Sequence, residues 1–176
     1  MRKITLAALA LASSAALVGI TAVPAFAVTD GTPVTVTVAA GDLSISVPSD
    51  TTLTTAASGT TSTTILGNTV VTDARAAVAG WEATVTLPAL TGPGTPATTI
   101  DTDTATYTAA AATTTGTVTV TAATTITDLT TAKPSQTATA VNGSNTATWT
   151  ASLAVPIPTH DVLVGDYTGT LTQSVS

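Results

Sequence analysis

The chain has 176 residues, of which 8% are charged and none is cysteine, and its formal net charge is −6. Arg75 and Lys133 are the only strong cations after residue 3, against ten acidic residues. This balance excludes nucleic acid and anionic membrane surfaces as partners, because binding them takes several Lys or Arg contacts. Without disulfides, the fold must depend on packing alone.

The first 29 residues have the three parts of a secretory signal peptide. Met1-Arg2-Lys3 is basic, the run from Ile4 to Thr29 is uncharged, and Ala25-Phe26-Ala27 is a small-x-small cleavage site. We therefore expect residues 1–27 to be cleaved and residues 28–176 to form one secreted, extracellular domain. The uncharged run would also suit an uncleaved membrane anchor of about 20 residues, but its alanine content and cleavage site favour removal.

Threonine and alanine dominate the mature part, and its apolar residues alternate with polar ones in short runs. The first run, Pro33 to Val38, places Val34, Val36 and Val38 on one face and threonines on the other. Such alternation predicts half-buried strands, and the branched Cβ of Thr and Val favours them. It recurs at Leu43 to Val47, Trp81 to Leu87, Thr117 to Thr121, Ala147 to Leu153 and Tyr167 to Val175.

Turn residues separate these runs, and Asn142-Gly143 between two alternating runs predicts a β-hairpin. Only Asp73 to Gly80 lacks the alternation, so we expect a helical turn or a compact loop there. The whole pattern predicts an all-β fold, a single antiparallel β-sandwich, Ig-like or related, with about eight to ten strands. An O-glycosylated threonine-rich stalk is the alternative, but a stalk has no reason to keep apolar residues in register.

Residues that could carry catalysis or bind a metal are scarce. His160 is the only histidine, and the neighbouring Asp161 would point to the opposite face of an extended segment, so a catalytic relay is not expected. Glu82, the sole glutamate, lies on the predicted solvent face of a strand. Asp101 and Asp103 share a face and could attract calcium, but the other ligands of a calcium loop are missing. We predict no enzyme, no metal and no cofactor.

The aromatic residues are few, which makes their positions informative. Trp81 and Trp149 lie in register with the apolar faces of their runs, and a buried Trp commonly anchors a β-sandwich core. Tyr107 and Tyr167 could tie down neighbouring backbone through their hydroxyl groups. The functional alternative is an exposed aromatic platform for a sugar, with Trp149 the better candidate.

Three segments together resemble the WxL domain family of Gram-positive surface proteins. Val71-Thr72-Asp73-Ala74-Arg75 followed by Gly80-Trp81 is similar to the family's V-x-D-x-R and Gly-Trp signature, and Gly41 to Ile45 looks like its G-x-L-x-I segment. Gly165-Asp166-Tyr167 and the alternating residues after it resemble the family's C-terminal strand. The signature tripeptides are altered, with Ala83 in the leucine position and Gln173 in the tryptophan position, as in a divergent, actinobacterial branch.

The resemblance implies a β domain that binds the cell wall noncovalently, through peptidoglycan, and works with other exported surface proteins. The candidate binding residues are Asp73, Arg75, Trp81, Trp149 and Tyr167. For Asp73 and Arg75 we favour a structural role, a bidentate ion pair that holds the loop before Trp81. The alternative function is a structural subunit that self-assembles into a surface fibre or layer, because few charges guard its strand edges.

Overall fold

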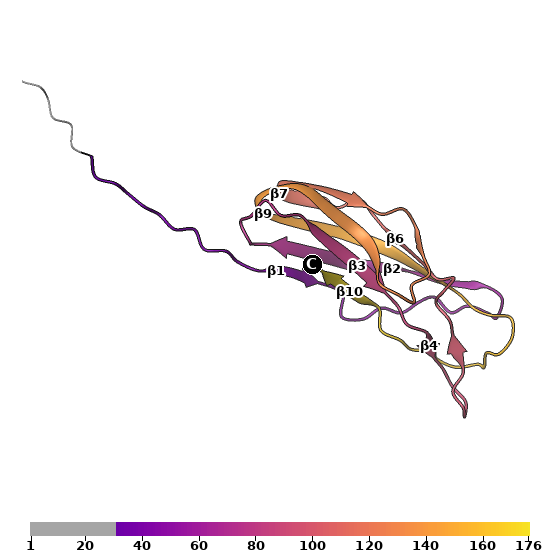
Figure 1. Ribbon diagram of the computed structural model, residues 1–176. Coiled ribbons are helices and arrows are strands. Elements are labelled where there is room, and N and C mark those ends of the chain that lie inside the picture. The colour runs from indigo at the N-terminus through magenta and orange to yellow at the C-terminus, as the bar shows by residue number, and fades with distance from the viewer. Residues whose placement is uncertain (1–30) are drawn as a thin grey trace, which may run out of the picture. The chain divides into compact units, whose positions relative to one another are not determined.

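The computed structural model describes residues 31–176, so the expected signal peptide lies outside the described part. Within that part all regular structure is β, and no helix is long and apolar enough to cross a membrane. Thr37–Ser176 forms one compact unit. Its strands are β1 (Leu43–Ser46), β2 (Thr61–Asp73), β3 (Trp81–Thr86), β4 (Leu90–Thr91), β5 (Thr99–Ile100), β6 (Thr106–Ala109), β7 (Thr113–Ala122), β8 (Ile126–Thr127), β9 (Lys133–Pro156) and β10 (Thr172–Val175) (Figure 1).

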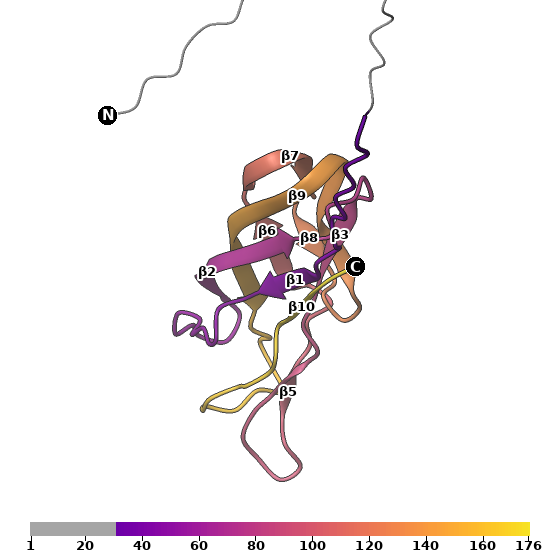
Figure 2. The ribbon, with the colours of Figure 1, turned by 90° about the vertical axis from the view of Figure 1, so that its left-hand side faces the viewer.

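One eight-stranded antiparallel sheet contains every strand except β4 and β5, which pair with each other. The path through it is β1-β2-β9-β3-β10, and β9 also pairs with β6 and β7 along its other side. At the two ends of this path, Cα atoms of β1 and β10 come within 8 Å of each other without a ladder of hydrogen bonds. The sheet therefore curls into a nearly closed barrel (Figure 2).

The antiparallel all-β prediction is confirmed, but the two face-to-face sheets of a sandwich are not what forms. The reason lies in β9, which has 24 residues and remains continuous through the predicted hairpin at Asn142-Gly143. The first part of β9 pairs with β3 and the last part with β2, so both halves of the molecule share one strand. The hairpin prediction is therefore wrong: these residues form a corner within β9.

The corner in β9 is a bulge against β7. Thr115 pairs with Thr146 and Thr117 pairs with Asn142. Between these two pairs the chain advances by two residues in β7 and by four in β9, so β9 has extra residues. Extra residues on one strand bend it and increase its twist. Ala140 and Gly143 adopt φ values of 51° and 79°, which turn the chain without breaking the strand.

The barrel interior is the core, and it contains the residues that the alternation predicted. Trp81 and Val85 of β3 and Trp149 and Leu153 of β9 are each at most 3% exposed. The alternating run from Trp81 does form a strand, in which every second side chain is buried. Both tryptophans are therefore core residues, and Trp149 has no exposed ring face that could serve as a sugar platform.

The first predicted strand, Pro33 to Val38, does not form in the isolated chain. These residues have no regular secondary structure, and Val34, Val36 and Val38 are 91%, 86% and 76% exposed. A strand needs a neighbour to satisfy its backbone groups, and none of the described ladders includes these residues. The alternation there is consequently a strand signal without a partner.

Candidate functional site

Asp73 and Arg75 form the bidentate ion pair that their spacing predicted. Nε of Arg75 lies 2.9 Å from Oδ1 of Asp73 and Nη2 lies 3.0 Å from Oδ2. The Arg75 backbone N–H also donates to Oδ1, at 3.1 Å, and Nη2 donates to the Gly80 carbonyl oxygen, at 3.1 Å. Asp73 is the last residue of β2, and this pair folds the following loop back toward Trp81. The loop contains no helical turn.

Asn145 completes this arrangement. The sequence did not single it out, because it follows the Asn142-Gly143 turn signal by only two residues. Asn145 of β9 is the ladder partner of Asp73 and is 3% exposed. Its Nδ2 donates to Oδ2 of Asp73 at 3.3 Å, and its Oδ1 accepts from Nε1 of Trp81 at 3.2 Å. We call Asp73, Arg75, Trp81 and Asn145 the Asp73 network. The residues of the V-x-D-x-R and Gly-Trp motifs are thus joined, through Asn145, around the buried carboxylate of Asp73.

The pKa shifts of Asp73 and Arg75 are those expected of an ion pair with a structural role. The hydrogen bonds from Arg75 hold the pKa of Asp73 below its usual value, although desolvation acts in the opposite direction. The same hydrogen bond raises the pKa of Arg75. The Asp73 side chain is 1% exposed, and both of its oxygens accept from Arg75, so the carboxylate is already occupied. This geometry fixes the loop before β3 and leaves no oxygen of Asp73 facing solvent for a ligand.

A second polar group lies inside the barrel around Tyr107 of β6. The Tyr107 hydroxyl donates to Oε1 of Gln173 at 3.1 Å, and Thr69 donates to the same oxygen at 3.3 Å. Nε1 of Trp149 donates to the Tyr107 hydroxyl at 3.5 Å. Burial raises the pKa of Tyr107, against the smaller opposing effect of the Trp149 hydrogen bond. Gln173 therefore attaches β10 to the barrel interior.

A cleft of about 1160 Å³ lies at one end of the barrel. It lies between two loops, residues 47–58 and residues 162–171, which precede β2 and β10. The buried side chains of Leu66, Leu87 and Leu153 form part of its lining, with threonines and serines of the first loop around them. An apolar floor with hydroxyl groups at the rim, built on loops above a rigid sheet, is typical of a binding site.

Tyr167 is the one predicted binding residue that lines the cleft. Its hydroxyl accepts from the Leu163 backbone N–H at 2.8 Å and forms a 2.8 Å hydrogen bond with Oγ1 of Thr98. It thereby holds the second loop against the segment between β4 and β5. Of the other predicted residues, Asp73, Arg75 and Trp81 belong to the Asp73 network, and Trp149 is buried beside Tyr107. The five residues are therefore not brought together into one site.

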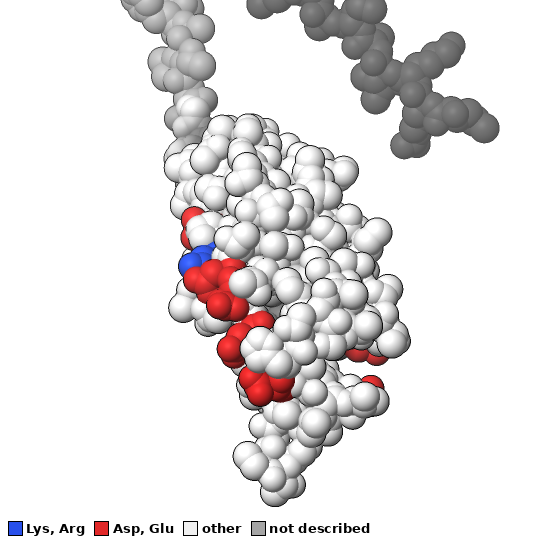
Figure 3. Space-filling view, turned by 90° about the vertical axis from the view of Figure 1, so that its right-hand side faces the viewer, with Lys and Arg blue, Asp and Glu red and all other residues white. Residues whose placement is uncertain are grey.

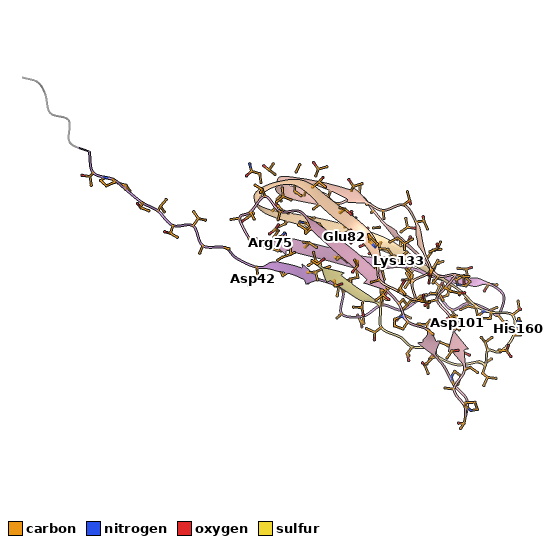
Figure 4. The ribbon with its side chains drawn as sticks, in the orientation of Figure 1. Asp42, Arg75, Glu82, Asp101, Lys133 and His160 are labelled. Atoms are coloured by element: carbon orange, nitrogen blue, oxygen red, sulfur yellow. The ribbon has the colours of Figure 1, made fainter. Side chains whose placement is uncertain are left out.

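Charged side chains are found at both ends of the barrel. Arg75 and Asp42 lie at one end of the barrel, whereas Asp101 and His160 lie at the other (Figure 4). His160 and Asp161 are both exposed, with Nε2 and Oδ2 4.0 Å apart. On the face shown in Figure 3, most of the visible acidic side chains form one band along one side, and most of the surface is uncharged. Within residues 31–176, no group of three His, Asp or Glu side chains is placed to hold a metal ion.

Comparisons with family models, with curated proteins and with solved structures find no match for this chain. The WxL resemblance accordingly rests on the short motifs alone.

Proposed function

We propose that this protein is a non-enzymatic exported module, a divergent relative of the WxL domain, that associates noncovalently with the cell wall or with other surface proteins. The cleft between residues 47–58 and residues 162–171 carries the proposal. Its volume of about 1160 Å³ accommodates a segment of a polymer, and its apolar floor and hydroxyl rim suit a ligand with both apolar and amide groups. The Asp73 network supports a scaffold role for the family-like motif, so binding is assigned to the cleft.

Wall association is tested by co-sedimentation of the exported protein with purified Gram-positive cell walls. Val164 lines the cleft and is fully exposed, so Val164→Lys changes the rim at little cost to folding. We expect this variant to lower the wall-bound fraction several-fold. Ile65→Lys is the matched control, because Ile65 is also exposed, at 78%, but lies outside the cleft. Wild-type protein that stays wholly in the supernatant would refute wall binding.

A second candidate function, a subunit that assembles with its own copies, is favoured by a separate observation. Three valines of an alternating, uncharged segment are exposed directly before the barrel. An alternating apolar strand without a partner is rare in a soluble domain, because its backbone and side chains can both pair with another chain. This observation does not depend on the cleft.

A further inference from the structure

The segment from Pro33 to Val38 has the alternating, β-branched sequence of a strand, but no described strand pairs with it. Val34, Val36 and Val38 are its exposed apolar side chains, and Thr35 and Thr37 occupy the other face. No charge lies between Gly31 and Gly41. Charged residues are a common device for keeping an edge strand from pairing, and this segment has none.

The gap between β1 and β10 cannot receive this segment. An inserted strand needs the strands on either side of it to stand about 9–10 Å apart, which is twice the usual spacing. Cα atoms of β1 and β10 already come within 8 Å of each other. The gap between them is thus too narrow for another strand.

The outer edge of β7 is open. Among the described residues β7 pairs only with β9, so the backbone groups along its other side lack a ladder partner over ten residues (Figure 1). No charged side chain lies on β7. Its pattern also matches the segment, because Val118 and Val120 are half-buried and alternate with exposed threonines.

If residues 33–38 paired with β7, valines would lie beside valines on one face and threonines beside threonines on the other. The valines of residues 33–38 would extend the apolar side formed by Val118 and Val120, and the threonines of both strands would stand opposite one another. Cross-strand pairs of β-branched residues and of threonines stabilise antiparallel ladders. Addition of an extended segment to an open sheet edge is a recurring mode of protein recognition.

We propose that residues 33–38 of one copy add to the β7 edge of a second copy. The donor and acceptor surfaces differ, so the contact is heterologous and repeats head to tail, giving a ring if it closes and a filament if it does not. This inference deepens the second candidate function and is independent of wall binding.

Two complementary variants test the contact. Val34→Lys/Val36→Lys disables the donor segment and keeps the β7 edge, whereas Thr117→Lys/Thr119→Lys charges the edge and keeps the donor. All four residues are exposed, so both variants should keep the wild-type melting temperature. We expect the wild type to form concentration-dependent oligomers in analytical ultracentrifugation and each variant to remain monomeric. An equimolar mixture of the two variants should stop at a dimer, since only one productive contact remains.

Three outcomes would overturn the inference: a wild type that stays monomeric at high concentration, variants that assemble like the wild type, or a mixture that remains monomeric. Ile65→Lys/Val78→Lys is the matched control, because it also replaces two exposed apolar residues, at 78% and 79%, outside both surfaces. The control should assemble as the wild type does. The monomeric donor variant is also sedimented with cell walls, so that loss of assembly and loss of wall binding are read separately.

Discussion

Asp73 is the residue whose chemistry most clearly determines local structure. It is buried at the end of β2, and its partners come from the following loop and from β9. A buried carboxylate stabilises a fold only when its hydrogen bonds are satisfied, and removing one member of such a pair leaves the other uncompensated. The Asp73 network therefore couples the loop before β3 to the barrel.

Replacing Asp73 with Asn should lower the free energy of unfolding by about 3 kcal/mol at pH 7, because Arg75 loses its carboxylate partner. The sign of the pH dependence follows from the lowered pKa of Asp73 in the folded state. Its stabilising contribution is present above the unfolded value of 3.8 and is lost as the pH falls through the lower, folded pKa. Urea denaturation between pH 7 and pH 2.5 measures both effects.

The Asp73→Asn variant should accordingly lose less stability than the wild type on acidification. Equal losses in the two proteins would show that other carboxylates, such as Asp128 with its own lowered pKa, account for the acid sensitivity.

At the scale of elements, β9 decides the architecture. A strand of 24 residues can serve both halves of a barrel only if it bends, and the bend lies where β7 and β9 differ in residue count. Gly116 of β7 and Gly143 of β9 both have positive φ, at 77° and 79°, on the two sides of this corner. Gly143 is in open space, whereas Gly116 packs against the backbone of β9, so alanine substitutions at the two positions test how tightly the corner is packed.

Gly143→Ala should destabilise the protein by about 1 kcal/mol, the cost of holding an alanine at positive φ, because no atom lies within 4 Å of the added Cβ. Gly116→Ala carries the same strain, and its Cβ would also lie 2.5 Å from the Ser144 carbonyl oxygen. We expect the second variant to be clearly less stable than the first in thermal denaturation. Equal melting temperatures would mean that the corner is not tightly packed.

At the scale of the whole molecule, the nearly closed barrel ends in a short strand, β10. β10 covers the outer edge of β3, and Gln173 satisfies the hydroxyl groups of Tyr107 and Thr69 in the interior. The four residues of β10 therefore supply both a ladder partner for β3 and the hydrogen-bond acceptor for two buried hydroxyl groups.

Removal of residues 172–176 should abolish cooperative unfolding, because it exposes the β3 edge and leaves buried hydroxyl groups unpaired. The measurements are calorimetry and binding of a dye that fluoresces on exposed apolar surface. The donor variant Val34→Lys/Val36→Lys is the control, because it changes residues outside the barrel's ladders, and it should melt as the wild type does. A truncated protein with an unchanged transition would show that β10 is dispensable for closure.

The local sequence pattern was enough to predict an all-β fold, the burial of both tryptophans and the ion pair of Asp73 with Arg75. These features depend on side-chain alternation and on groups two residues apart, which the order of residues determines directly. The sequence also predicted residues 33–38 to be a strand, but it could not show that none of the strands in residues 31–176 pairs with them.

Only the tertiary structure decided that the sheet curls into a nearly closed barrel, that Asn142-Gly143 is a corner in β9, and that Asn145 and Gln173 join the buried polar groups. Each of these depends on which distant strands become neighbours, and one Asn-Gly pair is compatible with a hairpin or with a bulge. Long-range pairing chose between them, because β7 continues to pair with β9 on both sides of the bend. The sequence by itself therefore determined the β class and the buried faces of strands such as β3, whereas the pairing of the strands determined the fold and placed the cleft.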